Sequence, residues 1–191
     1  MESDRKREGL SIALVPPSLE RLAHYAAALE QGWSPNNLRD VSGEQLAAIR
    51  ADGEKFVASL NPRAGGTVTL ADGRVVPRLP GPVLWIWDGE FCGSTSLRYV
   101  PGTEELPAHV SGHIGYAIVP WKRRRGYATR ALALLLPIAN AHGLKRAQLT
   151  CDDDNIASIR VIETNGGVLT ERRPDPDVPG GMKRIYWVAT G

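Results

Sequence analysis

Residues 112–142 read GHIGYAIVPWKRRRGYATRALALLLPIANAH, and this stretch decides the fold. Apolar residues alternate with small ones in Ile114–Val119, which predicts a buried strand. Pro120 has no amide hydrogen and ends the strand pairing. The segment rich in alanine and leucine, Tyr127–His142, predicts a helix, which we expect to kink or end early at Pro137 because proline lacks the donor. The stretch therefore reads as a strand, a basic turn and a helix.

The turn between this strand and this helix concentrates positive charge. Lys122–Arg125 are four cations in a row, and Gly126 and the small Ala128 follow them. The start of a helix exposes unpaired backbone N–H groups and the positive end of the helix dipole, and glycine has no side chain to keep a ligand away from them. The pattern predicts a cradle for a phosphorylated ligand. The alternative is a basic surface turn before an ordinary core helix.

The spacing in Arg123–Ala128 resembles the R/Q-x-x-G-x-G/A signature of the GCN5-related N-acetyltransferases, in which it binds the pyrophosphate of acetyl-coenzyme A (acetyl-CoA). The dinucleotide fingerprint G-x-G-x-x-G and the P-loop motif are absent. The segments GHIGY, RRRGYAT, LTCDDDNIAS and IETNGG are similar to a bacterial branch of predicted acetyltransferases of unassigned substrate. The resemblance covers about Pro82–Ala189 and implies acetyl-CoA as the co-substrate.

The composition indicates a packed domain without an unusual partner. The chain has 191 residues, of which 42% are hydrophobic and 23% charged, and its net charge is only +2, so bulk charge does not require a nucleic-acid partner. No apolar run approaches the roughly 20 residues that cross a bilayer, and the charged N-terminus does not read as a secretory signal. Cys92 and Cys151 form no C-x-x-C pair. We expect a cytoplasmic protein without a metal site or a membrane partner.

The predicted elements follow the order strand, two helices, three strands, helix, strand, helix and two strands. This order indicates an α/β (α+β) fold with a mixed, mostly antiparallel sheet of about seven strands and helices on both faces. We expect a flexible segment 1–9 and a single domain 10–191, in which 10–82 holds the first strand, the helices and a loop or flap, and 83–191 forms the coenzyme-binding core. The predicted strands are Leu10–Val15, Val83–Asp88, Phe91–Tyr99, Ile114–Val119, Lys145–Cys151, Val168–Arg172 and Lys183–Val188, and the predicted helices are Leu19–Gln31, Gly43–Leu60, Tyr127–His142 and Ile156–Thr164.

Two local patterns refine the N-terminal part. Gly53 lies inside the second predicted helix and is expected to break it in two. Thr67–Leu70 and Arg74–Pro77 flank a short turn, Ala71-Asp72-Gly73, in the pattern of a hairpin.

The resemblance implies that an amine attacks the acetyl thioester directly while both substrates are bound. In this family the strand before the signature splays from its neighbour and offers backbone groups to the coenzyme. Ile118 and Val119 occupy that position, and the Ile118 amide is expected to meet the thioester carbonyl. The alternative is that these groups pair with the next strand. The predicted coenzyme-binding residues are Ile118, Val119, Arg123, Arg124, Arg125, Gly126, Tyr127, Ala128, Thr129, Asn155 and Ser158.

The candidate base is His113. Family members often carry a glutamate on this strand, and the corresponding neighbourhood has no carboxylate here, whereas imidazole titrates near neutral pH. The alternative is that His113 is a hydrogen-bonded structural histidine. Glu104 and Glu105 could also fold over the site from their loop.

The candidate acid departs from the family pattern. Many members carry a tyrosine at the position of Ile162, which cannot donate a proton. The proton for the leaving thiolate is then expected to come from water, from Cys151, from Ser158 or from a residue outside this helix. Because a free thiol has a pKa near about 8.5, protonation by solvent is feasible.

The acceptor is the part that the sequence defines least. The acidic run Asp152–Asp154 fits either attraction of a cationic amine or turn and cap chemistry. We expect transfer of an acetyl group to a primary amine of a small molecule or peptide, by a protein that could form a homodimer. The alternatives are a non-catalytic acyl-CoA-binding sensor or partner subunit and a nucleic-acid or phosphoprotein binder. Five aromatic residues either line an acceptor cleft or pack in the core: Trp33, Trp85, Trp87, Tyr99 and Trp121.

Overall fold

The structure is a computed structural model that describes residues 11–36, 39–61, 66–70, 73–175 and 178–191. The predicted flexible segment 1–9 lies outside the described residues. The elements occur in the predicted order. The helices are α1 (Leu19–Glu30), α2 (Ser42–Ala51), α3 (Gly53–Leu60), α4 (Tyr127–Ala141) and α5 (Ile156–Thr164), and a 3₁₀ turn covers Pro120–Lys122. The strands are β1 (Ala13–Val15), β2 (Thr67–Thr69), β3 (Val75–Pro77), β4 (Val83–Trp87), β5 (Phe91–Leu97), β6 (Ile114–Ile118), β7 (Arg146–Asp152), β8 (Val168–Pro174) and β9 (Met182–Ala189).

Two helix boundaries test the predictions about glycine and proline. The break at Gly53 is confirmed, because α3 begins there as a separate helix, and the Asp52 carboxylate caps it by accepting a hydrogen bond from the Lys55 amide at 2.9 Å. An early end at Pro137 is wrong, because α4 continues to Ala141. Pro137 lies on the exposed side of the helix, where water can replace the missing hydrogen bond.

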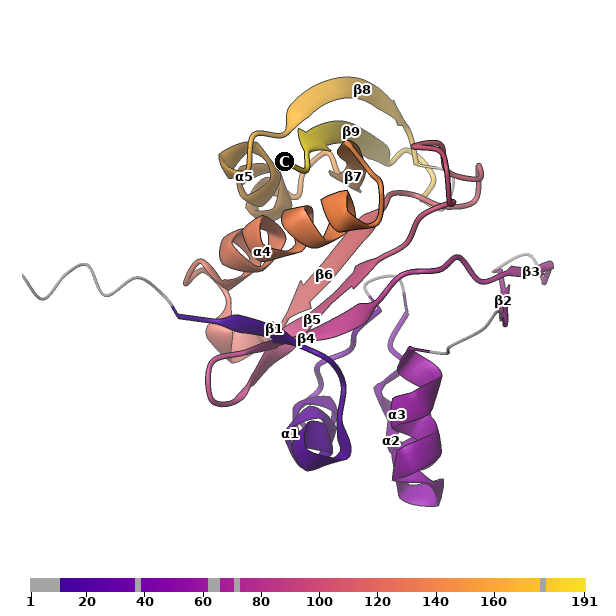
Figure 1. Cartoon of the computed structure of the whole chain (residues 1–191), viewed down its shortest axis with the longest axis vertical. Coiled ribbons are helices and arrows are strands. Elements are labelled where there is room, and N and C mark those ends of the chain that lie inside the picture. Colours follow the sequence, from indigo (N-terminus) through magenta and orange to yellow (C-terminus); the bar gives the residue numbers. More distant parts are fainter. Residues whose placement is uncertain (1–10, 37–38, 62–65, 71–72, 176–177) are drawn as a thin grey trace, which may run out of the picture.

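Seven strands form two antiparallel sheets. The first has the order β1-β4-β5-β6 and the second the order β7-β9-β8. The predicted strand count and the mostly antiparallel pairing agree with this arrangement. Among the described strands β6 and β7 form no ladder, which agrees with the splayed strands that the family resemblance implies (Figure 1). The two sheets join where the His113 amide donates to the Gln148 carbonyl at 2.8 Å and the Gln148 amide donates to His113 Nδ1 at 2.9 Å. One edge of β6 therefore faces an opening instead of a neighbouring strand.

Helices cover both faces of the first sheet (Figure 1). Successive side chains of a strand point to opposite faces, and β4 shows the result. Trp85 stacks on Tyr25 of α1, with ring centroids 5.0 Å apart, whereas the next residue, Ile86, packs with Tyr127 and Ala131 of α4. The face of α1 to α3 is therefore aromatic, and the face of α4 is aliphatic.

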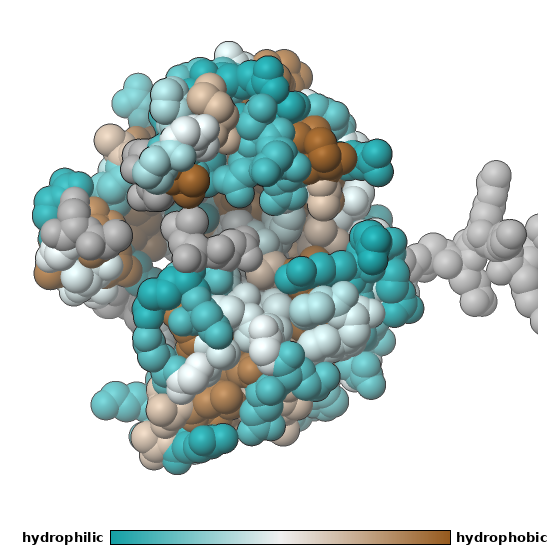
Figure 2. All heavy atoms as spheres, turned by 180° about the vertical axis from the view of Figure 1, so that it is seen from behind, coloured by the Kyte–Doolittle hydropathy of each residue, from teal (hydrophilic) through white to brown (hydrophobic). Residues whose placement is uncertain are grey.

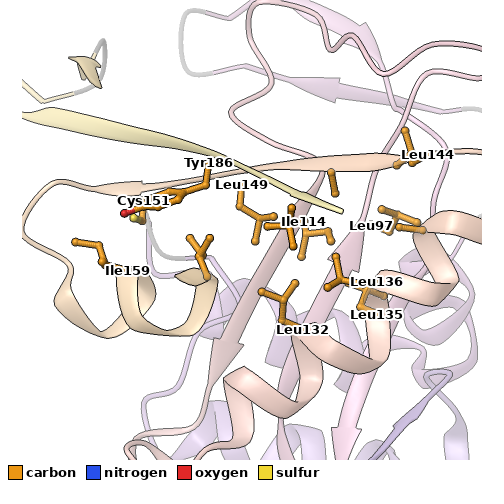
Figure 3. Close-up of a cluster of buried hydrophobic side chains, with 14 residues drawn as sticks. Leu97, Ile114, Leu132, Leu135, Leu136, Leu144, Leu149, Cys151, Ile159 and Tyr186 are labelled. Carbon is orange, nitrogen blue, oxygen red and sulfur yellow. The ribbon is translucent and has the colours of Figure 1, made fainter. Parts of the chain in front are cut away.

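The aliphatic core beneath α4 holds the two sheets together (Figure 3). Leu132 and Leu136 of α4 lie beside Leu97 and Ile114 of the first sheet, and Leu149 of the second sheet belongs to the same cluster. Each buried leucine or isoleucine contributes about 1.5–3 kcal/mol. This packing explains how β6 and β7 can separate at one end without parting the sheets.

A small hairpin stands apart from both sheets. β2 and β3 pair antiparallel with Val68 opposite Val76, which confirms the predicted hairpin. The Arg78 guanidinium fixes its end to α3 through hydrogen bonds to the carbonyls of Ser59 at 3.1 Å and Leu60 at 2.9 Å. Figure 1 shows the hairpin projecting from the side of the molecule.

The surface carries no broad apolar area on the face that Figure 2 shows, where small hydrophobic patches are separated by hydrophilic side chains. The most exposed large hydrophobic side chains, Val168 and Val75, belong to different elements. Within the described ranges, no helix is long and apolar enough to pass through a bilayer.

Candidate functional site

A cleft of about 2330 Å³ opens where β6 separates from β7, and its lining comes from both faces of the first sheet. The coenzyme half, on the side of α4, is lined by Tyr116, Ile118, Arg123, Arg124, Gly126, Tyr127, Ala128, Thr129, Cys151, Asn155 and Ser158. The acceptor half, on the side of α1, is lined by Trp85, Ser94, Ser96, Arg98, His109, Ser111 and Gly115 and includes Leu70 and Arg74 of the hairpin region. Of the predicted site residues, Val119, Arg125 and His113 do not line the cleft.

The backbone at the start of α4 presents a row of unpaired donors. In the part of the chain that the structure describes, the amides of residues 124–129 donate to no protein group. The first hydrogen bond of the helix runs from the Arg130 amide to the Gly126 carbonyl at 3.0 Å. Because the cleft reaches Gly126, Ala128 and Thr129, these donors are open to a ligand. Unpaired amides at a helix start form a site for a phosphate or diphosphate group.

The turn reaches this shape through two left-handed residues. Gly126 has a φ of 86°, a conformation that glycine adopts without strain. Arg124 has a φ of 58° and is the only non-glycine residue with a positive φ among the described residues. Left-handed residues in a turn can bring successive N–H groups to one side of the backbone. The sequence motif thus acts through backbone conformation.

The four predicted cations do not all face the cleft. Lys122 is buried, and its ammonium donates to the two carboxylate oxygens of Asp88 at 2.7 and 2.9 Å. Burial disfavours its charged form, but the hydrogen bonds to Asp88 outweigh burial and raise the pKa of Lys122 to about 12. Arg123 Nε donates to the Ile118 carbonyl at 3.0 Å and ties the turn to the strand. The exposed positive charge is therefore that of Arg123–Arg125.

Tyr127 supports the turn from the protein interior. Its ring is buried and its hydroxyl donates to the Asp88 carboxylate. The Lys122 ammonium and the Arg125 guanidinium each lie 5.7 Å from the ring centroid. Burial raises the pKa of Asp88, but hydrogen bonds from Lys122 and Tyr127 outweigh it and hold that pKa well below its usual range. Tyr127 therefore offers a ligand only its backbone amide.

The ladder between β5 and β6 decides which backbone groups of β6 are free. The Val119 amide donates to the Cys92 carbonyl at 3.0 Å, and the Arg98 amide donates to the His113 carbonyl at 2.9 Å. Because hydrogen bonds alternate from side to side along an antiparallel strand, the Ile118 amide points away from β5 toward the open edge. The Val119 amide is already paired and its side chain is buried, so the geometry supports Ile118 and speaks against Val119 as a ligand contact.

His113 is buried at the junction of the two sheets and does not reach the cleft. Its Nδ1 accepts the Gln148 amide, which puts the ring proton on Nε2, and Nε2 has no partner among the described residues. Burial lowers the pKa of His113 to about 4, with smaller opposing effects of Glu104 and Arg98. A base needs a free acceptor nitrogen near the reacting amine. The structure thus speaks against His113 as the base and for the structural alternative.

The loop before β6 carries the predicted alternative base Glu104 and also His109, and the two differ in position. The Glu104 carboxylate accepts hydrogen bonds from the amides of Lys145 and Arg146, each at 3.1 Å, and from Arg146 Nε at 2.8 Å. It is therefore held at the start of β7 and does not lie over the site. His109 is exposed and, among the described residues, is the imidazole that lines the cleft.

A tyrosine faces the coenzyme half from β6. Ile162 of α5 is buried in the aliphatic cluster, and Tyr116 of β6 packs against the same cluster. The Tyr116 hydroxyl is buried and makes no hydrogen bond of good geometry with a described residue. Burial raises the pKa of Tyr116 to about 12, and Ser158 lies near enough to lower it in part. A neutral phenol therefore lines the cleft close to the position where the family pattern places its tyrosine.

The start of α5 contributes polar groups to the same half. The Asn155 side-chain oxygen accepts the Ser158 amide at 3.0 Å and caps α5, and both residues also line the cleft. Cys151 lies next to them, and burial raises the pKa of its thiol to about 11. At neutral pH this cysteine is a thiol and not a nucleophilic thiolate.

The remaining acceptor candidates are mostly structural. Trp33 and Trp85 belong to the aromatic core around α1, although Trp85 also borders the cleft. Asp152 pairs with Lys183, at 2.5 Å. Asp153 pairs with arginines of β8 and β9, so turn and ion-pair chemistry accounts for the acidic run.

Two cleft residues were missed by the sequence reasoning. Tyr116 was assigned to the apolar side of a strand, and the signal for it was a hydroxyl in an otherwise apolar run. Arg98 was counted as one position of a predicted strand, and the signal was a cation at a strand end without an acidic residue nearby in the sequence.

The donor set fits a nucleotide-type coenzyme. Unpaired amides and exposed arginines suit a diphosphate, and the open edge of β6 suits an extended amide-containing chain, which can pair with it as a strand would. Among the described residues, no group of three or more His, Cys, Asp or Glu side chains could hold a metal ion.

Comparison with known proteins gives a consistent result. A family model described as an acetyltransferase (GNAT) domain matches residues 44–168, and no curated protein matches the chain. RimJ of Mycobacterium smegmatis, solved with CoA-disulfide, is similar at 20% identity with a TM-score of 0.64, covering 93% of this chain and 81% of that one. The microcin C7 self-immunity acetyltransferase MccE, solved with acetyl-CoA and AMP, is similar at 16% identity with a TM-score of 0.61, covering 93% and 92%. The yncA protein of Salmonella typhimurium, solved with its cofactor acetyl-CoA, is similar at 16% identity with a TM-score of 0.55, covering 95% and 94%. At these identities the similarity shows the fold.

Proposed function

Because this chain belongs to the GNAT family of acetyltransferases, which use acetyl-CoA as co-substrate, we propose that it acetylates a primary amine of a small molecule or peptide. Its activity class is that of an acyl-CoA-dependent acetyltransferase. The proposal concerns the acceptor and the route: bound acetyl-CoA supplies an acetyl thioester, and the amine attacks it directly while both are held in the cleft.

The unpaired backbone of the coenzyme half carries this proposal. The amides of residues 124–129 donate to no described group, and a buried or partly buried amide without a partner is costly unless a ligand or water satisfies it. The open edge of β6 begins at the same turn, so a ligand held by its diphosphate extends along the strand toward Ile118. The residues that would hold the coenzyme are Ile118, Arg123, Arg124, Arg125, Gly126, Tyr127, Ala128, Thr129, Asn155 and Ser158.

Two groups of this chain support the proposed acetyl transfer. The Ile118 amide points to the open edge and would donate to the thioester oxygen, on which negative charge develops during attack. The Tyr116 hydroxyl stays protonated at neutral pH because burial raises its pKa to about 12, and it would hold a proton beside the departing sulfur. Tyr116 would thus do from β6 what a tyrosine at the position of Ile162 does from α5.

Direct attack is favoured over a covalent acyl-enzyme. Cys151 is the cysteine that lines the cleft among the described residues, and burial raises the pKa of its thiol to about 11. Because the thiolate is the nucleophilic form, Cys151 is unreactive at neutral pH. Initial rates at varied concentrations of both substrates should therefore give intersecting lines, whereas parallel lines would indicate an acyl-enzyme.

A screen with purified protein tests the proposal. The protein is mixed with acetyl-CoA and a panel of amino acids, polyamines, aminoglycosides and peptides, and thiol release and acetylated products are measured. Amine-dependent thiol release with a matching acetylated product is the expected result. Tight acetyl-CoA binding without release for any amine would identify a sensor instead. Absence of acetyl-CoA binding would reject the coenzyme site itself.

The proposal includes a cytoplasmic location and a homodimer. Support for the dimer is limited to β8, an edge strand that exposes Val168 and Leu169, and exposed apolar edges favour pairing with a second chain. Analytical ultracentrifugation of the wild type and of Val168→Lys tests it. A monomer for both proteins at micromolar concentration would rule the dimer out.

A further inference from the structure

The acceptor half contains an arginine that has no partner charge among the described residues. Arg98 follows β5 and lines the cleft, half-buried. Its Nε donates to the Gly112 carbonyl at 2.7 Å. An added Cβ on Gly115 would lie 3.1 Å from Arg98 Nη2, so the guanidinium rests against the β6 backbone at the one point where that face has no side chain.

The charge of Arg98 is not neutralised by the described part of the protein. None of the ion pairs or carboxylate hydrogen bonds of the described residues involves Arg98. Burial lowers the pKa of Arg98, and no neighbouring acid acts against this effect. A partly buried cation without a counter-charge destabilises the free protein. An anion that enters the cleft would remove that penalty.

The free edge of the guanidinium suits a carboxylate. With Nε occupied by Gly112, the two η nitrogens remain and present a flat pair of donors, which matches the two oxygens of a carboxylate. The Ser96 hydroxyl lies 3.5 Å from the added Cβ on Gly115, and Ser94, His109 and Ser111 line the same half of the cleft.

The spacing along β6 limits the length of the acceptor. Gly115 and Ile118 are three residues apart, which is about 10 Å in a strand. A guanidinium–carboxylate contact takes about 2.8 Å, and an amine in position to attack lies about 3.2 Å from its target. Roughly 4 Å then remains between the carboxylate and the amine. That separation occurs in α- and β-amino acids.

We propose that Arg98 binds the carboxylate of the acceptor and that the acceptor is an α- or β-amino acid. This inference rests on the proposed function, because it concerns the second substrate of the same cleft. Arg98 is a specificity-determining residue: it orients the acceptor so that the amine faces the open edge of β6 at Ile118.

Matched acids and amides test the proposal. Alanine is compared with alaninamide, β-alanine with β-alaninamide, and 6-aminohexanoate with its amide, by kcat/KM at saturating acetyl-CoA. An amide has the less basic amine, so intrinsic reactivity favours it. We expect the wild type to prefer the two short acids by roughly 10- to 100-fold, as for a lost charge-assisted hydrogen bond, and to show no such preference for the long acid. Equal rates for short acids and amides would overturn the proposal.

Variants locate the preference at Arg98. Arg98→Gln should lose the preference for acids while keeping its rate with the amides, and Arg98→Lys should keep part of it, because charge remains without the planar fork. Gly115→Ala should reduce the preference in a protein of unchanged melting temperature, because the new methyl group displaces Nη2. Arg50→Gln is the matched control, since Arg50 pairs with Glu30 on the surface, at 3.6 Å. A full preference retained in Arg98→Gln would refute the assignment.

A binding measurement separates this proposal from the activity. N-acetylalanine and N-acetylalaninamide are titrated by calorimetry into protein saturated with coenzyme A. The acid should bind the wild type roughly tenfold or more tightly than it binds Arg98→Gln, and the amide should bind both alike. If acid binding depends on Arg98 but no amine is turned over, the proposed carboxylate site is supported and the proposed acetyl transfer is rejected. Turnover without any preference for acids would reject only the carboxylate site.

Discussion

The two halves of the cleft bind by different chemical groups. The coenzyme half uses the main chain, through the amides of residues 124–129 and the open edge of β6. The acceptor half uses side chains that come from several elements, with Arg98 against Gly115 at its centre. Backbone recognition depends on conformation, which a short local motif can specify, whereas side-chain recognition depends on what the fold brings together. Substitutions in the coenzyme half and in the acceptor half should therefore impair different properties, namely coenzyme binding and acceptor recognition.

The largest effect is expected for Gly126→Trp in the coenzyme half. The indole would cover the unpaired amides, and the φ of 86° would strain any residue other than glycine. Several charge-assisted hydrogen bonds of about 1.5–3 kcal/mol each would be lost. We expect the Kd for acetyl-CoA to rise at least about 100-fold, measured by calorimetry.

Gly143→Trp is the control for backbone strain. Gly143 follows α4, has a φ of 89°, and has open space around an added Cβ, but it does not line the cleft. This variant should lose a similar amount of stability and bind acetyl-CoA like the wild type. Equal acetyl-CoA affinities for Gly126→Trp and Gly143→Trp would break the distinction between the two halves, because the coenzyme would then not depend on the turn.

Tyr116→Phe should come next in size and should act on turnover alone. Removing a group that holds a proton for the leaving sulfur is expected to lower kcat about 100-fold, with the affinity for acetyl-CoA unchanged. The melting temperature should stay the same or rise, because the buried hydroxyl has no partner of good geometry among the described residues. Steady-state kinetics and thermal denaturation measure the two effects.

Tyr99→Phe provides the comparison. The Tyr99 hydroxyl lies 3.0 Å from His142 Nδ1, outside the cleft, and its removal should leave kcat unchanged. If Tyr116→Phe turned over as fast as Tyr99→Phe, solvent would be the proton donor and the coenzyme half would be a binding surface only.

His113, at the junction of the two sheets, should affect stability and not catalysis. Its pKa in the folded protein is about 4, below the ordinary value of 6.5, so the unfolded chain takes up the proton first as the pH falls. The contribution of His113 to the free energy of unfolding is therefore complete above about pH 6.5. It declines by on the order of 3 kcal/mol in total as the pH falls to about 4, and then levels off. Denaturant unfolding of the wild type across this range should show the decline.

His113→Gln removes the titrating group and should flatten that decline while leaving the pH profile of kcat unchanged. The opposite pattern, with a flat stability curve in the wild type and a kcat that collapses in His113→Gln, would restore His113 as the base. The two readouts separate a residue that holds β6 to β7 from one that takes part in the reaction.

Much of the fold was predictable because each boundary has a local chemical cause. Gly53 breaks the second helix and Asn155 caps α5, and both effects depend on residues within one turn. The antiparallel pairing of seven strands also agreed with the prediction. The separation of β6 from β7 was expected from the family resemblance and not from a local pattern, since it depends on whether the two strands bond along their length. In the described part of the chain, main-chain and side-chain hydrogen bonds between His113 and Gln148 join the two sheets.

The candidate site shows the same difference between features set by local sequence and features set by contacts between distant elements. The cradle at Gly126 follows from a motif of a few residues, and its amides are unpaired as expected. Lys122 was placed in the cradle because of its neighbours in sequence, but Asp88, 34 residues away, holds it in the interior. The roles of Val119 and His113 depend on pairing with Cys92 and Gln148 on other strands. Contacts between distant elements therefore account for the differences between the expected and the observed positions.

The smallest effect is expected for Arg124→Gly and tests whether the turn itself stores strain. A φ of 58° costs an ordinary residue about 1–2 kcal/mol, and glycine relieves this cost but adds about 0.4–1 kcal/mol of unfolded-state entropy. We expect the free energy of unfolding to change by less than about 1 kcal/mol, in the stabilising direction. Acetyl-CoA binding should weaken only a few-fold, because one exposed cation is lost from a backbone site. Arg125→Gly removes the same charge from a residue without a positive φ, so it should be the less stable of the two by urea denaturation. Equal losses of stability in the two variants would mean that Arg124 is unstrained and that the amides converge without help from its backbone.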